Sequence, residues 1–174
     1  FRRPYARDPD LHEAYLGAGF LALEVVDWAR AAREFGALLA RNPRKPEARL
    51  GLAEMYLAAS KYTEAEEEAK KALSVNPALA GARMVLASLH LIDDRLDDAR
   101  CEIDAALDAT PRDPAVLAMD ATWKFASGDE AAFEAAIERA LKLYPRAVGM
   151  YTGPAEVLER RRRFPEALDQ YREA

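Results

Sequence analysis

The sequence predicts an all-α solenoid, in which similar helical hairpins stack one after another. Prolines recur every 34 residues, at Pro9, Pro43, Pro77, Pro111 and Pro145. Between these prolines, apolar residues recur at helical spacing in two blocks, which are separated by a polar turn such as Ser60-Lys61-Tyr62. A fixed period of this length indicates stacked supersecondary units, and two helical blocks per period make each unit a helical hairpin.

Helix boundaries divide the chain into repeats. The residue before a proline is disfavoured in the α region, so Asn42-Pro43 and Asn76-Pro77 are expected to end helices, while Asp113-Pro114 caps and opens one. We expect one repeat domain over residues 1–174, and its parts are the end of a preceding repeat (1–11), four hairpins (12–45, 46–79, 80–113 and 114–147) and a truncated fifth repeat (148–174). The chain starts without Met and stops inside a helical pattern, so we expect both ends to be cut from something longer.

Two small-residue positions support this repeat. The first, at which adjacent helices would approach closely, holds Gly19, Ala53, Ala87, Ala121 and Ala155. The second, early in the second helix of each hairpin, holds Ala31, Ala65, Ala99 and Ala167. With these residues the sequence resembles the tetratricopeptide repeat family over nearly its whole length. The resemblance implies a right-handed superhelix whose concave side is lined by the first helices.

The fourth and fifth repeats depart from the family pattern. In the fourth, Asp120, Lys124 and Phe133 stand where the family has leucine, an aromatic residue and alanine, and Trp123 falls where a small residue is usual. This repeat is either shifted by one residue or specialised. In the fifth, Gly153-Pro154 would lie inside a helix, so we expect that helix to start near Pro154 or to kink there.

Composition excludes several function classes. The net charge is −5 and charges of both signs are interspersed, which argues against a nucleic-acid or anionic-membrane surface. A single cysteine, Cys101, cannot form an internal disulfide, so the compartment stays open. The sequence has no apolar run of membrane-spanning length and no signal-peptide pattern at its start, so we expect a soluble segment of unknown localisation.

Side chains that could carry chemistry are few. His12-Glu13-Ala14-Tyr15-Leu16 begins like a zinc-protease motif but has Leu16 in place of the second histidine. His90 takes a position that is usually aromatic in the family, so a packed, hydrogen-bonded histidine is preferred to a ligand or a catalyst. For Cys101 a buried structural thiol is preferred to a reactive one.

Three other patterns also have ordinary explanations. The acidic run 93–98 lacks the glycine and the terminal glutamate of a calcium loop, so a solvated helix cap is preferred. Gly17-Ala18-Gly19 has no strand before it and no lysine partner for a phosphate loop. The arginine run 160–163 falls at a predicted hairpin turn. We therefore expect no enzyme activity, no catalytic residue, no cofactor and no metal.

A partner-binding groove is the expected product of the stacked first helices. The family's groove-facing positions fall here on Leu16, Phe20, Leu23, Leu50, Glu54, Leu57, Met84, Ser88, Leu91, Thr122 and Phe125. This largely apolar lining favours an amphipathic helix or an apolar peptide as the ligand, although Leu23, Leu57, Leu91 and Phe125 would also serve to pack helix against helix. Some family members clamp a chaperone-tail carboxylate, but Leu16, Phe20, Gly51, Gly81 and Val85 supply neither the charge nor the donors for this.

Two hypotheses for the function follow. The first is a protein-interaction scaffold that binds a protein or peptide partner in the groove. The second is a substrate-recruiting or assembly arm of a larger bacterial enzyme whose catalytic domain lies outside this segment; 19 arginines against 6 lysines are typical of a high-GC bacterial gene. A third expectation is self-association through the apolar end of the truncated fifth repeat.

Overall fold

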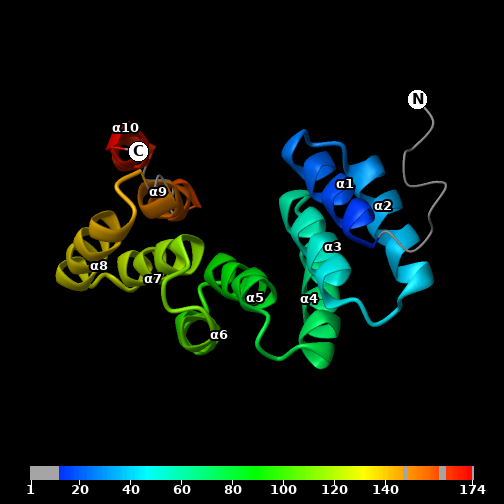
Figure 1. Cartoon of the computed structure of the whole chain (residues 1–174). Helices are drawn as coiled ribbons and strands as arrows, with labels where there is room; N and C mark the ends of the chain where they lie inside the picture. The colour runs from blue at the N-terminus through cyan, green and yellow to red at the C-terminus, as the bar shows by residue number, and fades with distance from the viewer. Residues whose placement is uncertain (1–11, 147–148, 161–163, 174) are drawn as a thin grey trace. The chain divides into compact units, whose positions relative to one another are not determined.

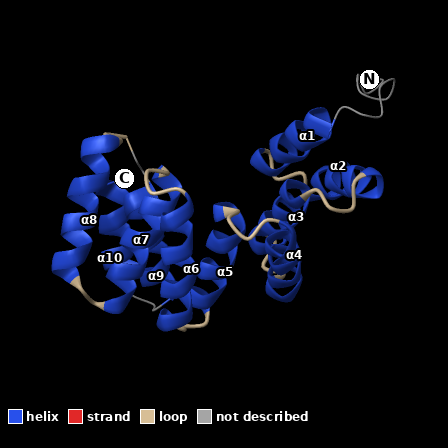
Figure 2. Ribbon diagram, turned by 60° about the horizontal axis from the view of Figure 1, so that its bottom comes forward, coloured by secondary structure: helices blue, strands red, loops and turns tan. Residues whose placement is uncertain are grey.

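The computed structural model describes residues 12–146, 149–160 and 164–173, and every regular element within these ranges is an α-helix (Figures 1 and 2). The helices are α1 (His12–Glu24), α2 (Trp28–Arg41), α3 (Pro46–Ala58), α4 (Tyr62–Val75), α5 (Ala80–Ile92), α6 (Leu96–Ala109), α7 (Pro114–Ser127), α8 (Glu130–Leu143), α9 (Gly149–Arg160) and α10 (Phe164–Glu173). The all-α prediction is confirmed.

Helix starts follow the 34-residue period. First helices begin at residues 12, 46, 80 and 114, and second helices begin at residues 28, 62, 96, 130 and 164. Asn42 and Asn76 are the C-caps of α2 and α4, and Asp113 caps α7 by accepting hydrogen bonds from the backbone N–H groups of Ala115 and Val116. The fourth hairpin therefore keeps the register of the others, which favours specialisation over a one-residue shift.

The helices form two compact units, within residues 1–85 and 86–174, which we describe separately. In the first unit, α1 packs on α2 and α3 packs on α4 (Figure 1). Phe35 of α2 is fully buried at its centre. A Cβ added to Gly19 of α1 would lie 2.4 Å from the Phe35 ring, and one added to Gly51 of α3 would lie 2.2 Å from it. The two glycines thus leave the space that this ring fills.

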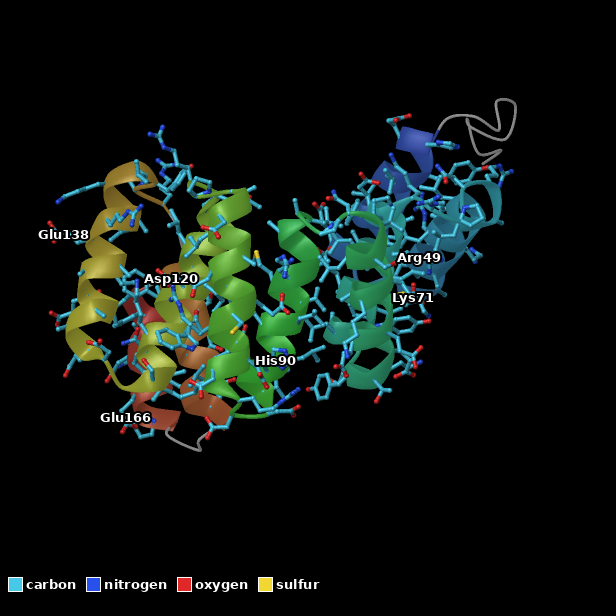
Figure 3. The ribbon with its side chains drawn as sticks, turned by 90° about the horizontal axis from the view of Figure 1, so that it is seen from below. Arg49, Lys71, His90, Asp120, Glu138 and Glu166 are labelled. Atoms are coloured by element: carbon cyan, nitrogen blue, oxygen red, sulfur yellow. The ribbon has the colours of Figure 1, made fainter. Side chains whose placement is uncertain are left out.

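A second feature of the first unit is the ion-pair network between α3 and α4. Arg49 Nη1 lies 2.9 Å from one carboxylate oxygen of Glu68, and Lys71 Nζ lies 2.7 Å from the other. Figure 3 labels Arg49 and Lys71 on this hairpin. The network joins the two helices through one acidic side chain.

The turn inside each of the first four hairpins contains a residue with positive φ, at the same repeat position. These residues are Val26 (φ 59°), Ser60 (58°), Asp94 (57°) and Gly128 (81°). Left-handed backbone costs an L-residue roughly 1–2 kcal/mol, and a β-branched side chain suits it least. Val26 is 61% exposed, so little packing offsets that cost.

Val26→Gly is accordingly expected to raise the free energy of unfolding of the first unit by about 1 kcal/mol, because glycine adopts positive φ without a steric penalty. Urea titration measures the change. Val25→Gly is the matched control, since Val25 is 64% exposed but has no positive φ. The control should lower stability by about 0.5–1 kcal/mol through chain entropy. Equal effects of the two substitutions would contradict the assignment of strain to Val26.

The second unit contains the four residues of the fourth repeat that depart from the family pattern, and three of these four join one polar network. Asp120 of α7 is 8% exposed, and its carboxylate lies 2.7 Å from Arg100 Nη1 of α6 and 2.6 Å from Lys124 Nζ. The Arg100 guanidinium lies over the Trp123 ring at 4.9 Å, and Trp123 Nε1 donates a 2.8 Å hydrogen bond to the Leu96 carbonyl. Figure 3 labels Asp120 within this unit.

The fourth departure, Phe133 of α8, fills the place of the usual alanine. It is 9% exposed and packs edge to face on Phe125, with ring centroids 5.2 Å apart. Together with the network, this packing shows that the fourth repeat is specialised.

Two expectations are corrected by the second unit. The expectation that a helix starts near Pro154 is wrong, because α9 begins at Gly149 and carries a fully buried Pro154 inside it. A proline near the start of a helix removes a single backbone hydrogen bond, which close packing of α9 on α7 outweighs. The expected burial of Cys101 is also wrong. Cys101 is exposed because α6 turns Ala99, Ile103 and Ala106 inward.

Candidate partner-binding groove

A groove of about 230 Å³ lies in the second unit, where three first helices meet. It is lined by Ser88 and Leu91 of α5, by Ala115, Ala118, Met119 and Thr122 of α7, and by Thr152, Gly153, Glu156 and Val157 of α9. Ser88, Thr122 and Glu156 occupy the same repeat position, since they are 34 residues apart. The solenoid period therefore places equivalent residues of consecutive repeats in one groove.

Close approach of α7 and α9 forms one part of the groove. A Cβ added to Gly153 would lie 2.0 Å from Thr122 Oγ1, so only glycine fits at this distance. Thr122 is 6% exposed, and its Oγ1 donates a 2.9 Å hydrogen bond to the Ala118 carbonyl of its own helix. Small residues thus let α7 and α9 pack closely at this wall of the groove.

The lining combines apolar surface, hydroxyl groups and one carboxylate. Leu91, Met119 and Val157 supply apolar contact, while Ser88 and Thr152 can donate or accept hydrogen bonds. Among the described residues, the lining holds no histidine or lysine that could activate either hydroxyl, and no group of His, Cys, Asp or Glu could hold a metal ion. Binding of a peptide-like ligand is the chemistry that such a surface supports.

The predicted groove residues of the second unit divide between two places. Ser88, Leu91 and Thr122 line the groove. Phe125 instead contacts Phe133 and lines another cavity of about 440 Å³, together with Gly128, Glu130, Glu134, Leu158, Glu166 and Gln170. Glu166 is labelled in Figure 3.

Seven groove residues were absent from the sequence-based set: Ala115, Ala118, Met119, Thr152, Gly153, Glu156 and Val157. Three of them could have been found by extending the period. Ala118 and Thr152 continue the series of Leu16, Leu50 and Met84, and Glu156 continues the series of Phe20 and Glu54. The departures in the fourth and fifth repeats obscured these positions.

The predicted residues of the first unit lie half-buried on its helices. Leu16, Phe20 and Leu23 of α1 pack against the core, and Phe20 meets Phe35 edge to face at 5.2 Å. Leu50 contacts the backbone of α5, since a Cβ added to Gly81 would lie 2.7 Å from it. Glu54 and Leu57 of α3 and Met84 of α5 are also half-buried.

Glu54 is the charged residue among these positions. Burial raises the pKa of Glu54 from its ordinary 4.5 to about 6. The side chain forms no hydrogen bond or ion pair with a described residue that would offset this desolvation. The ionised form is therefore disfavoured in the folded state, and the first unit loses stability as the pH rises from 4.5 through about 6.

Glu54→Gln is expected to stabilise the first unit by up to about 2 kcal/mol at neutral pH, because glutamine carries no charge to desolvate. The difference from wild type should shrink as the pH falls toward 4.5, where the carboxyl group is increasingly protonated in both states. Urea titrations of both proteins at a series of pH values measure this difference in the free energy of unfolding.

The control for this titration is Glu138→Gln, on the exposed face of α8 (Figure 3). A hydrogen bond from Lys142 lowers the pKa of Glu138, so its removal should act in the opposite direction. A stability difference for Glu54→Gln that does not depend on pH would contradict the role of charge burial.

The other candidates lie outside the groove. His90 of α5 is half-buried, and its Nδ1 has no hydrogen-bond partner among the described residues (Figure 3). Asp93 and Asp98 are exposed and pair with Arg95 at 3.3 and 3.4 Å. The side chains of the arginine run 160–163 lie outside the described residues. Among the described helices, none is long and apolar enough to cross a membrane.

Comparisons with known proteins agree on the family and the fold. The family model for the tetratricopeptide repeat matches residues 16–79, 56–114 and 128–174. Among proteins of curated function, none matches the sequence.

Three solved structures illustrate the likeness in fold. TTC0263, a thermophilic TPR protein of Thermus thermophilus, is 24% identical with a TM-score of 0.74, over 94% of this chain and 89% of that one. PilF of Pseudomonas aeruginosa is 18% identical with a TM-score of 0.72, over 93% and 75%. YrrB, described as a TPR protein with an unusual peptide-binding site, is 15% identical with a TM-score of 0.60, over 96% and 88%. The predicted solenoid of TPR-like hairpins is confirmed.

Proposed function

The chain belongs to the tetratricopeptide repeat family, and we propose that it binds a peptide segment of a partner protein in the groove between α5, α7 and α9. Proteins with this fold are in general non-catalytic scaffolds for protein–protein interaction. The observation that carries the proposal is that three consecutive first helices contribute equivalent residues to one lined groove. The fold likeness to YrrB, whose own peptide-binding site is named, supports the search for a peptide ligand.

The proposal extends to the first unit as a separate surface. Phe20 and Glu54 occupy the repeat position that Ser88, Thr122 and Glu156 hold in the second unit. Each is half-buried and so keeps part of its side chain accessible.

The test is selection of a displayed random peptide library on the whole chain, followed by affinity measurements with Ala115→Trp. Ala115 is exposed at the groove, so tryptophan should fill the groove without disturbing the core. We expect selected peptides to lose affinity by about tenfold or more. Ala109→Trp, at an exposed alanine near the end of α6, is the matched control and should leave affinity unchanged. Selected peptides that all bind Ala115→Trp as tightly as wild type would remove the groove from the function.

A further inference from the structure

The charged side chains at the described groove positions are all acidic. Glu156 is exposed and lines the groove of the second unit, and Glu54 holds the same repeat position in the first. Within the described part of the chain, the groove lining contains no lysine or arginine. Electrostatic attraction at these positions therefore favours a cation and disfavours phosphate groups and acidic tails.

Basic side chains are engaged elsewhere. In the first unit, Arg49 and Lys71 hold Glu68 between α3 and α4. In the second unit, Arg100 and Lys124 hold Asp120 beside α6. These cations therefore serve helix packing, and neither Glu54 nor Glu156 has an ion pair with a described residue.

Glu54 also lowers the stability of its own unit. Glu54 is half-buried and pairs with no cation among the described residues, so desolvation disfavours its ionised form and raises its pKa to about 6. A partner's lysine or arginine placed beside it would offset this cost on binding. Residues that reduce stability in this way are typical of binding sites.

From this charge pattern, which rests on the proposed groove function, we infer that the segment bound in the groove of the second unit is cationic and amphipathic: its apolar side chains contact the groove wall, and its lysine or arginine side chains pair with Glu156. On the first unit taken by itself, Glu54 would pair with a cation in the same way. In the second unit the apolar contacts are Leu91, Met119 and Val157. Ser88 and Thr152 can hydrogen-bond the peptide backbone nearby.

The experiment uses the peptides that are selected on the whole chain and lost with Ala115→Trp. We expect them to be enriched in lysine and arginine, and their affinity to fall with increasing salt. Glu156→Gln should weaken them by about 2–5-fold, as for an exposed ion pair. Glu54→Gln should weaken a cationic peptide that binds the first unit by about tenfold, because that carboxylate is half-buried.

The control removes the same charge outside the groove, with Asp108→Asn at an exposed position of α6. Replacing each peptide cation with glutamine should abolish the sensitivity to Glu156→Gln, which identifies the paired atoms by a double-mutant cycle. Groove-dependent peptides without excess cations, or with equal affinity for Glu156→Gln and wild type, would overturn the inference and leave the groove function intact. An absence of groove-dependent peptides would overturn both.

Discussion

Replacing Phe35 with alanine is expected to lower the free energy of unfolding of the first unit by about 3–5 kcal/mol, as for large-to-small substitutions in a tight core. Phe35 is fully buried, and the backbones of Gly19 and Gly51 form two sides of its pocket. Backbone atoms that belong to α1 and α3 cannot collapse into the space as flexible side chains could. The cavity should therefore persist after the substitution, and the free energy of unfolding should fall by the full cost of that cavity.

The two tryptophans allow each unit to be followed separately. Trp28 packs against the core of the first unit, and Trp123 lies in the second. Phe35→Ala should be measured by urea titration in a Trp123→Phe background, so that fluorescence reports Trp28. Phe35→Leu is the graded control and should cost less, because it fills part of the cavity. A loss below about 1 kcal/mol for Phe35→Ala would show that the pocket collapses.

A substitution at Gly51 tests whether the Phe35 pocket needs glycine on its walls. Gly51→Ala would place a methyl group 2.2 Å from the Phe35 ring, so one of the two must move. Overpacking of this kind typically costs about 1–3 kcal/mol. In a Phe35→Leu background, the smaller side chain should leave room for part of the methyl group that Gly51→Ala adds. The loss of unfolding free energy in the double variant should therefore be smaller than the sum of the losses in the two single variants.

Much of the fold followed from periodicity. The 34-residue spacing of prolines and the small residues at fixed positions predicted an all-helical hairpin array, because helix pairs need alanine or glycine where their backbones approach. Ala53, Ala87, Ala121 and Ala155 are indeed fully buried. Helical spacing can be read within one repeat, and the period can be read by comparing successive repeats of the same sequence.

What could not be predicted depends on neighbours distant in sequence. Asp120 looked like a departure because its partner Arg100 lies on another helix, and no local pattern joins the two. Pro154 looked like a helix breaker because propensity does not include its complete burial in the second unit. Cys101 looked like a core residue because free cysteines usually are, although the inward face of α6 excludes it.

The groove residues were also predicted only in part. Ser88, Leu91 and Thr122 lie on the positions that the family pattern gave. Thr152 and Glu156 were missed because Gly153-Pro154 made the first helix of the fifth repeat look interrupted. The packing of the described helices, and no local pattern, decides that Asp120 has a counter-charge and that Glu54 has none among the residues of those helices.

The second large effect is expected for Asp120→Ala, which should lower the free energy of unfolding of the second unit by about 2–4 kcal/mol. The substitution leaves Lys124 without its carboxylate partner and Arg100 with only the more exposed Asp104, and uncompensated charge near a buried position is strongly destabilising. The expected loss of unfolding free energy is smaller than for a fully buried triad of charges, because the Arg100 and Lys124 side chains are 31% and 24% exposed. Urea titration in a Trp28→Phe background, with Trp123 as the fluorescent reporter, measures the change.

The control separates pairing from packing. Replacing Arg100, Asp120 and Lys124 together with leucine removes the three charges at this position and leaves Asp104, whose side chain is 53% exposed to solvent. Such apolar replacements of buried ion pairs are often neutral or stabilising. The triple variant should therefore be more stable than Asp120→Ala, although it has lost more polar contacts. If both variants were destabilised equally, the network would act through side-chain volume rather than charge, and the fourth repeat's departure from leucine at position 120 would need another physical cause.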